Sequence, residues 1–132
     1  MVDQTRDGPF VQVFIGWIFT SAEYLMEEKR LRDFIDDLVK ELDMTVIMPT
    51  VGIRLPIKRY TDIQGRMPSE LDYGYSLVTM ISESHIALHT WPHFDKAFLE
   101  IVSCCKFEPE KVKEVIMNYF LGCKIDIKRL DM

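Results

Sequence analysis

Short stretches of alternating or continuous apolar residues recur along the chain and predict a sheet. The first stretch, residues 10–19, is mostly apolar and is typical of a strand that lies inside a sheet. From residue 123 to residue 130 apolar and charged side chains alternate, which indicates a half-buried closing strand. The other segments with strand character are residues 45–48, 52–60, 73–81, 82–91 and 96–104.

Two segments show the spacing of apolar residues, three and four apart, that indicates an amphipathic helix. One runs from Ser21, a residue suited to an N-cap, to about residue 42. The other begins at Glu108-Pro109-Glu110, with proline and carboxylates in its first turn, and ends at Gly122. The apolar stripe of each helix is expected to lie on a sheet face.

The order of these elements is strand, helix, several strands, helix and strand. This order predicts an α+β fold, a two-layer sandwich with a mainly antiparallel sheet and two helices on one face. The length of 132 residues and the 48% hydrophobic composition are those of one domain, so residues 1–132 are expected to form a single unit. Within it, residues 61–72 predict a mobile loop of a length that is often functional.

Charge and composition exclude several classes of partner. The net charge of -5 and the pI of about 5.2 argue against a nucleic-acid binder, which would need a basic surface. The apolar run of residues 10–19 is too short to cross a bilayer and lacks the features of a secretory signal, so a cytoplasmic protein without a membrane partner is expected. The odd number of cysteines, Cys104, Cys105 and Cys123, indicates free thiols rather than a disulfide framework.

Reactive side chains are concentrated in the stretch Ser82–Trp91. In an extended strand, Ser84 and Thr90 share one face and His85 and His89 share the other. A strand that only filled a core would be richer in Val, Ile and Thr. The residues alone therefore leave two interpretations of the polar start of this stretch, a turn or a chemical site.

Three histidines, His85, His89 and His93, follow one another at intervals of four. On a helix this spacing would place them on one face, as in a metal site. Pro92 cannot lie inside such a helix, and in a strand followed by a turn His93 leaves the line of the other two. No metal site is therefore expected.

The run SESHIALHTWP, residues 82–92, resembles the processing and catalytic segment of the small prokaryotic S-adenosylmethionine decarboxylases, which are pyruvoyl enzymes of polyamine synthesis. The resemblance includes Glu-Ser-His, a histidine five residues after the serine, and Cys104 twenty residues after Ser84. It extends to Ser76, eight residues before Ser84. It implies that the chain cleaves itself between Glu83 and Ser84.

The resemblance also implies a role for each matching residue. The Ser84 hydroxyl attacks the Glu83 carbonyl to give an ester, and elimination leaves a dehydroalanine that becomes a pyruvoyl group, with His89 and Ser76 assisting the proton transfers. The pyruvoyl carbonyl forms a Schiff base with the substrate amine and accepts the electron pair released with carbon dioxide. Cys104 corresponds to the acid that protonates the resulting carbanion.

Three places depart from the family pattern, and one of them is Asp95-Lys96, which replaces a small, glycine-containing turn. His93 stands where the family has a glutamate that bonds ribose hydroxyls, and Glu70 stands where it tends to have an aromatic residue that stacks on adenine. S-adenosylmethionine is the first expected substrate. Arginine or ornithine is the alternative, because Glu70 and Asp72 would suit a cationic side chain. As acids in a loop, both are also explained as solvated surface residues.

The resemblance implies a homodimer, since a domain of this size encloses a deep pocket more readily by sharing its walls across a two-fold axis. A second possibility is an unprocessed homologue that keeps the fold and regulates an active partner, because the positions that would face the ligand differ from the family pattern.

Overall fold

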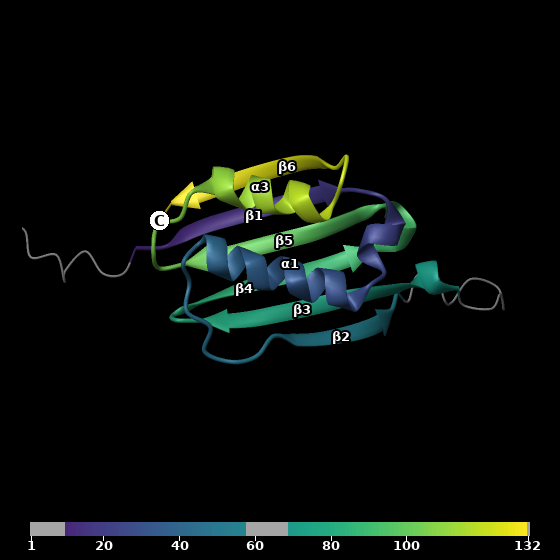
Figure 1. Cartoon of the computed structure of the whole chain (residues 1–132), viewed down its shortest axis with the longest axis horizontal. Coiled ribbons are helices and arrows are strands. Elements are labelled where there is room, and N and C mark those ends of the chain that lie inside the picture. Colours follow the sequence, from purple (N-terminus) through teal and green to yellow (C-terminus); the bar gives the residue numbers. More distant parts are fainter. Residues whose placement is uncertain (1–9, 58–68, 132) are drawn as a thin grey trace, which may run out of the picture.

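The computed structural model describes residues 10–57 and 69–131. A six-stranded sheet with the order β2-β3-β4-β5-β1-β6 forms one layer, and every neighbouring pair of strands is antiparallel. Helices α1 (Glu28–Glu41) and α3 (Pro109–Tyr119) lie side by side on one face of this sheet (Figure 1). The predicted α+β sandwich is confirmed. The strands are β1 (Gln12–Phe19), β2 (Val51–Pro56), β3 (Tyr73–Ile81), β4 (Ser84–Trp91), β5 (Lys96–Ser103) and β6 (Lys124–Asp131).

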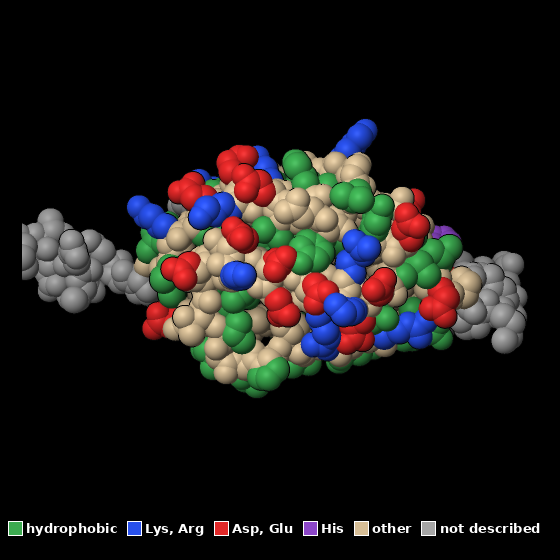
Figure 2. Space-filling view, viewed as in Figure 1, with side chains coloured by type: hydrophobic (Ala, Val, Ile, Leu, Met, Phe, Trp, Pro, Cys, Tyr) green, Lys and Arg blue, Asp and Glu red, His purple; other side chains and the backbone are tan. Residues whose placement is uncertain are grey.

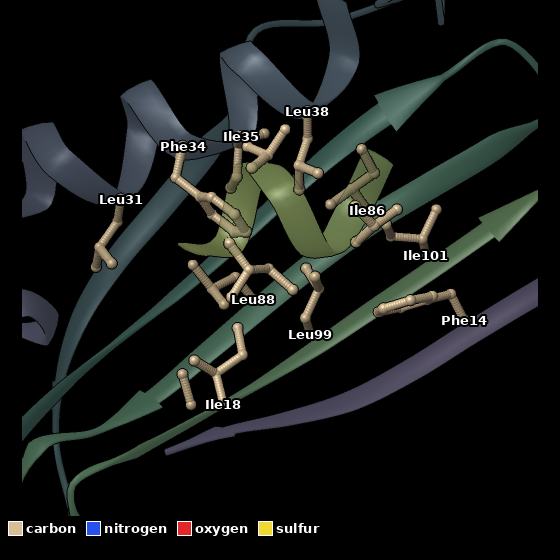
Figure 3. Packing of buried hydrophobic residues seen from close by; sticks show 14 of the residues in the cluster. Phe14, Ile18, Leu31, Phe34, Ile35, Leu38, Ile86, Leu88, Leu99 and Ile101 are labelled. Carbon is tan, nitrogen blue, oxygen red and sulfur yellow. The ribbon is translucent and has the colours of Figure 1, made fainter. Parts of the chain in front are cut away.

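The core lies between the sheet and the two helices. The apolar stripe of α1 points at the inward-facing residues of β4 and β5 (Figure 3). Phe34 of α1 is fully buried, and its ring centre lies 5.1 Å from that of Phe120, which follows α3. Each buried side chain of this size contributes about 1.5–3 kcal/mol of burial free energy, so the stripe holds α1 on the sheet. The fully buried residues of the stripe are Leu31, Phe34, Ile35 and Leu38.

The segment before α1 differs from the prediction of one helix starting at Ser21. A short 3-10 helix, η2 (Ala22–Leu25), comes first, and α1 begins after Glu27. The Ser21 side chain makes no capping hydrogen bond. Instead, Asp95 accepts hydrogen bonds from the backbone N–H groups of Thr20 and Ala22, at 3.0 and 3.1 Å. These contacts tie the first turn to the far end of β4 and separate it from the helix.

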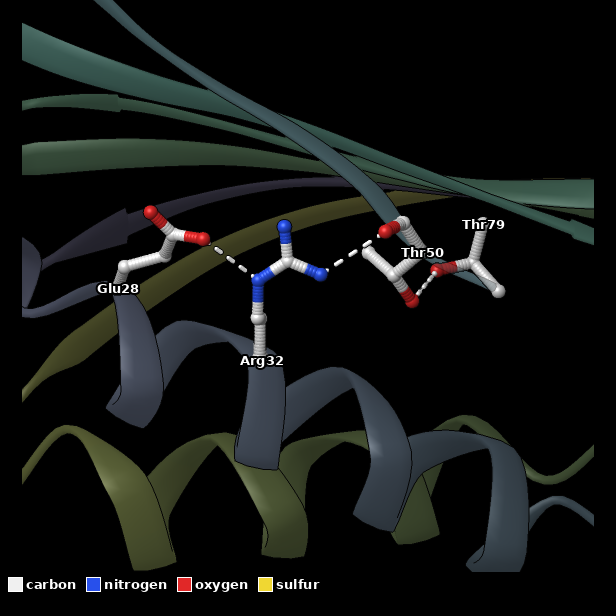
Figure 4. A network of polar contacts seen from close by, with 4 residues as sticks. All are labelled: Glu28, Arg32, Thr50 and Thr79. Carbon is white, nitrogen blue, oxygen red and sulfur yellow. Dashed lines mark hydrogen bonds and ion pairs between the residues drawn. The ribbon is translucent and has the colours of Figure 1, made fainter. Parts of the chain in front are cut away.

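The predicted strand at residues 45–48 is wrong, because this segment makes only one isolated bridge, between Val46 and Ile81. Two backbone hydrogen bonds of 2.9 Å form this bridge, from the Ile47 N–H to the Met80 oxygen and from the Ser82 N–H to the Thr45 oxygen. Side chains hold the residues that follow (Figure 4). Arg32 of α1 donates to the backbone oxygen of Thr50 at 2.9 Å, and the Thr50 and Thr79 hydroxyls lie 2.6 Å apart. Helix α1 therefore positions the start of β2.

The region after β2 is only partly described. β2 ends at Pro56, earlier than the predicted strand over residues 52–60, of which 58–60 lie outside the described residues. The predicted mobile loop over residues 61–72 likewise falls mostly outside them. Its last residues form a short 3-10 helix, η3 (Glu70–Asp72), which corrects the loop prediction at that end.

The remaining predicted elements are confirmed within a residue or two. Residues 92–95, predicted as a turn, form the 3-10 helix η4 (Pro92–Phe94) with Asp95 in a left-handed conformation. Gly122 follows α3 with a φ of 71°, which a residue without Cβ adopts readily.

The two faces of the sheet differ. Charged side chains are spread over the helix-covered face (Figure 2). On the other face, which no described helix covers, the register aligns apolar residues of β2 and β3 that are 37–56% exposed. We call this second face the open face. Its exposed apolar residues on these strands are Val51, Ile53, Leu55, Val78 and Met80. Among residues 10–57 and 69–131, no helix is long and apolar enough to cross a membrane.

Candidate active site

The Glu83-Ser84 peptide lies at the tight connection between β3 and β4. Ile81 pairs with Ser84, so only Ser82 and Glu83 link the two strands. Glu83 has a φ of 58°, in the left-handed region that costs a non-glycine residue about 1–2 kcal/mol. The turn interpretation and the chemical interpretation of this stretch therefore coincide, because the turn contains a strained residue next to the expected cleavage bond.

Ser84 and Cys104 meet at this connection although they are twenty residues apart in sequence. Ser84 is 8% exposed, and its Oγ accepts a hydrogen bond of 2.9 Å from the Cys104 backbone N–H. The Cys104 thiol lies 3.4 Å from a Glu83 carboxylate oxygen. β4 and β5 are neighbours in the sheet, which explains this arrangement. We call Glu83, Ser84 and Cys104 the cleavage cluster.

The surroundings of Cys104 keep its thiol protonated. The Ser84 hydroxyl favours the thiolate, but partial desolvation, the Glu83 carboxylate and Cys105 oppose it, and together they raise the pKa of Cys104 above its ordinary value. A thiol that holds its proton near neutral pH is suited to donate it.

Ser76 and His89 form a second group. They are direct partners in the register of β3 and β4, and Ser76 Oγ lies 2.8 Å from His89 Nδ1. Both side chains are on the open face, next to a pocket of about 210 Å³ that Leu55, Tyr75 and Trp91 also line. A hydroxyl hydrogen-bonded to an imidazole is a pair that can transfer protons. We call Ser76 and His89 the histidine cluster.

The two clusters do not meet within one chain. Ser84 and His89 are five residues apart on β4, which at about 3.3 Å per residue separates their Cα atoms by about 17 Å. Their side chains also point to opposite faces, as the alternation predicts. The structure therefore groups the sequence-predicted residues into two sites at opposite ends of β4.

The two acids considered for substrate binding have different environments. Glu70 is exposed, and its carboxylate lies 2.7 Å from Arg54 Nη2. Asp72 is fully buried and accepts a hydrogen bond of 2.7 Å from the Ser69 backbone N–H, as part of a capping box. The Asp72 carboxylate therefore has a structural role at η3.

The three histidines are dispersed. His93 lies in η4 with its ring 5.8 Å from that of Phe94, and His85 Nε2 lies 3.5 Å from Glu100 on β5. Within residues 10–57 and 69–131, no group of three His, Cys, Asp or Glu side chains could hold a metal ion.

Sequence reasoning missed Ser103 and Lys96. Ser103 Oγ bonds both the backbone N–H and the backbone oxygen of Cys105, at 3.1 and 2.7 Å, and so fixes the chain beside Cys104. Lys96 Nζ lies 4.4 Å from the centre of the Trp17 ring, on the open face. The contact of Lys96 with Trp17 depends on the pairing of β5 with β1, whereas the Ser103 contact is a local turn between residues two apart.

Comparison with known proteins gives consistent results. A family model described as S-adenosylmethionine decarboxylase matches residues 13–131. A solved structure of the adenosylmethionine decarboxylase from Aquifex aeolicus superposes with a TM-score of 0.62 over 92% of this chain and 88% of that chain, at 17% identity. The superposition shows that the two chains share a fold.

The curated relatives include decarboxylase proenzymes named for two different substrates. An S-adenosylmethionine decarboxylase proenzyme of Sulfurisphaera tokodaii is 28% identical over 121 residues, 91% of this chain and 85% of the relative. One from Clostridium botulinum is 36% identical over 58 residues, 43% of this chain and 50% of the relative. An arginine decarboxylase proenzyme of Aeropyrum pernix is 34% identical over 59 residues, 44% of this chain and 45% of the relative.

Proposed function

The chain belongs to the S-adenosylmethionine decarboxylase family, and we propose that it is a self-processing, pyruvoyl-dependent decarboxylase of polyamine biosynthesis that acts on S-adenosylmethionine in the cytoplasm. The observation that carries this proposal is the cleavage cluster. Ser84 lies directly after a strained Glu83 and is hydrogen-bonded to the backbone of Cys104.

In the proposed processing step, the Ser84 hydroxyl attacks the Glu83 carbonyl carbon. An ester forms at Ser84 Oγ while the Glu83-Ser84 C–N bond breaks, and elimination then releases the Glu83 carboxylate. The left-handed conformation of Glu83 supports this step, because cleavage relieves the strain of the turn. The dehydroalanine left at residue 84 tautomerises to an imine, and water hydrolyses this imine to the pyruvoyl group with release of ammonia. The products are residues 1–83 and 84–132.

The residues around Ser84 suit a pyruvoyl group formed from it. That group supplies a carbonyl that accepts the electron pair released when carbon dioxide leaves. Cys104 lies beside it with a thiol that keeps its proton, since the pKa of Cys104 is raised. Cys104 is therefore the proposed proton donor to the substrate carbon.

The separation of the two clusters supports a homodimer. Ser76 and His89 are the proposed helpers in processing, yet they lie about 17 Å along β4 from the Ser84 of the same chain. If two chains pack open face to open face about a two-fold axis near the middle of β4, each histidine cluster lies over the end of the partner's β4 that carries the Glu83-Ser84 connection. Burial of the exposed Val51, Ile53 and Met80 would stabilise such a dimer.

Denaturing mass spectrometry tests the processing. We expect the purified chain to convert from one species of 15.5 kDa to the two fragments 1–83 and 84–132, with the second beginning in a pyruvoyl group. Ser84→Ala is the control and should remain intact. A wild-type chain that stays intact on prolonged incubation would instead support the unprocessed regulatory homologue, particularly if it raised the activity of a partner enzyme.

A second substrate class has specific support. One relative is named an arginine decarboxylase proenzyme, and His93 stands where the resemblance places a ribose-binding glutamate. The exposed Glu70 could bind a guanidinium only by giving up Arg54. Carbon dioxide release from labelled S-adenosylmethionine, arginine and ornithine, measured in parallel, decides between the two classes.

A further inference from the structure

We propose that Cys104 and Cys105 form a vicinal dithiol modification site, at which low-molecular-weight disulfides oxidise the two thiols to a reversible Cys104-Cys105 bridge. The two Sγ atoms lie 4.0 Å apart. The consequence for turnover, loss of the thiol that donates the proton, rests on the proposed function. The formation of the bridge itself does not depend on the proposed function.

The backbone around the pair is held from both sides. The Cys104 N–H donates to Ser84 Oγ at 2.9 Å, and Ser103 Oγ bonds the N–H and the backbone oxygen of Cys105. A disulfide has a sulfur–sulfur distance of about 2.05 Å, so the two sulfur atoms need to approach by about 2 Å. Rotation of the two side chains supplies part of this movement, and distortion of the peptide between the two residues supplies the rest.

A reagent can reach the pair through Cys105. Cys105 is exposed, and it lines a pocket of about 220 Å³ between the end of α1 and the connection of β3 and β4. Cys104 is less exposed than Cys105. Cys105 is therefore the thiol that meets the reagent first, and Cys104 is the thiol that resolves the product.

The remaining cysteine is too far away to compete. Cys123 precedes β6, whose first residue pairs with Phe19 at one end of β1, whereas Ser103 pairs with Gln12 at the other end. The length of β1, eight residues, places these two ends about 25 Å apart. Burial also raises the pKa of the Cys123 thiol, which makes it less reactive.

The chemistry balances as two exchanges. The Cys105 thiolate attacks a disulfide RSSR, a sulfur–sulfur bond forms, and one RS⁻ leaves and takes up the proton that Cys105 gave up. The Cys104 thiolate then attacks the Cys105 sulfur and displaces the second RS⁻, which takes up the Cys104 proton. Both thiols are oxidised together by two electrons, and RSSR is reduced to two RSH.

The bridge should be easily reversed. The Cα atoms of adjacent residues are about 3.8 Å apart, whereas disulfides usually join Cα atoms about 4.4–6.8 Å apart. A bridge between neighbours is therefore strained, and strained disulfides are readily reduced by thiols. This property fits a reversible modification better than a structural crosslink.

The test treats the purified full chain with oxidised glutathione and measures its mass under non-reducing denaturing conditions. We expect the piece that contains Cys104 and Cys105 to lose about 2 Da, the mass of two hydrogen atoms. Peptide mapping should place the bridge between these two residues, and dithiothreitol should reverse it. Carbon dioxide release should fall and recover in parallel.

Matched variants make the result decisive. Cys105→Ser keeps both backbone hydrogen bonds to Ser103 and should show neither the mass loss nor a bridged peptide. Cys123→Ser should behave as the wild type. The inference is overturned if the wild type gives only glutathione adducts or no change, or if Cys105→Ser still loses two hydrogen atoms. If the bridge forms but the chain releases no carbon dioxide before oxidation, the proposed function fails and the modification site stands.

Discussion

Ser76 and His89 face each other across neighbouring strands, 2.8 Å apart from Oγ to Nδ1, and the register of β3 and β4 fixes them at the opposite end of β4 from Ser84. Proton transfer needs contact within about 3 Å or through one water. If Ser76 and His89 assist the cleavage at Ser84, as proposed, we expect them to act from the partner chain of a dimer.

Mixed dimers test this directly. Ser84→Ala and His89→Ala chains, each expressed alone, should remain intact, because each homodimer lacks one required group at both sites. When the two are co-expressed, the His89→Ala chain should be cleaved, since the partner supplies the His89 that assists cleavage at its Glu83-Ser84 connection. Mass spectrometry of differently tagged chains distinguishes them. Cleavage of the His89→Ala chain alone, at the wild-type rate, would contradict the role of His89.

Cys104→Ala should separate processing from turnover. Its backbone N–H still donates to Ser84 Oγ, so cleavage should continue. Without the thiol, carbon dioxide release should fall by about 10²–10⁴-fold, the usual contribution of a general acid. Fragment masses and release of labelled carbon dioxide provide the two measurements. An equal loss of cleavage and of carbon dioxide release would mean that Cys104 acts mainly in processing.

The pH dependence of kcat should report the titration of the Cys104 thiol. The protonated form is the donor, so activity is present below the pKa of Cys104 and is lost as the pH rises through it. In the uncleaved chain the contact with the Ser84 hydroxyl lowers this pKa, and the conversion of Ser84 removes that contact, while desolvation and Cys105 still raise the pKa. The basic limb should therefore fall above the ordinary value of 9.0. Because Cys105 raises this pKa, Cys105→Ser should move the limb toward lower pH. If the basic limb of the pH profile were unchanged in Cys104→Ala, it would belong to another group.

The closing strand β6 was readable from alternation, because Ile125 and Ile127 are partly buried and the charged residues between them are exposed. β1 was readable from its apolar run, which lies between β5 and β6 inside the sheet. The start of the first helix, α1, could not be read from the sequence. Ser21 has the right chemistry for an N-cap, but Asp95, distant in sequence, binds the backbone of Thr20 and Ala22 and imposes a separate turn. A tertiary contact of this kind leaves no local signal.

The residues of the candidate site were predicted through a family resemblance, while their grouping was not. The alternation along β4 placed Ser84 and His89 on opposite faces, and this was enough to infer that their side chains point apart. It could not show that Ser76 pairs with His89 rather than with Ser84, since that depends on the register set by the two-residue connection.

Asp72 and Glu70 should respond differently to mutation. Asp72→Ala removes a buried carboxylate that bonds the Ser69 backbone, and should lower the free energy of unfolding by about 1–3 kcal/mol. Glu70→Ala breaks only an exposed ion pair with Arg54 and should cost less than about 1 kcal/mol. Urea denaturation measures both. If Asp72→Ala were as stable as the wild type but had a raised KM, Asp72 would instead bind the substrate.

His93→Glu tests which substrate class the site accepts. The variant restores a carboxylate at the position where the resemblance places the ribose-binding glutamate, at the exposed turn η4, so the fold should tolerate it. If S-adenosylmethionine is the substrate, hydrogen bonds from its ribose hydroxyls to a charged acceptor, worth about 1.5–3 kcal/mol each, should lower KM by about tenfold or more. His93→Gln, which adds a neutral acceptor, should give a smaller effect. A KM that falls for arginine, and not for S-adenosylmethionine, would instead indicate that the added carboxylate binds a guanidinium and that the native substrate is a basic amino acid.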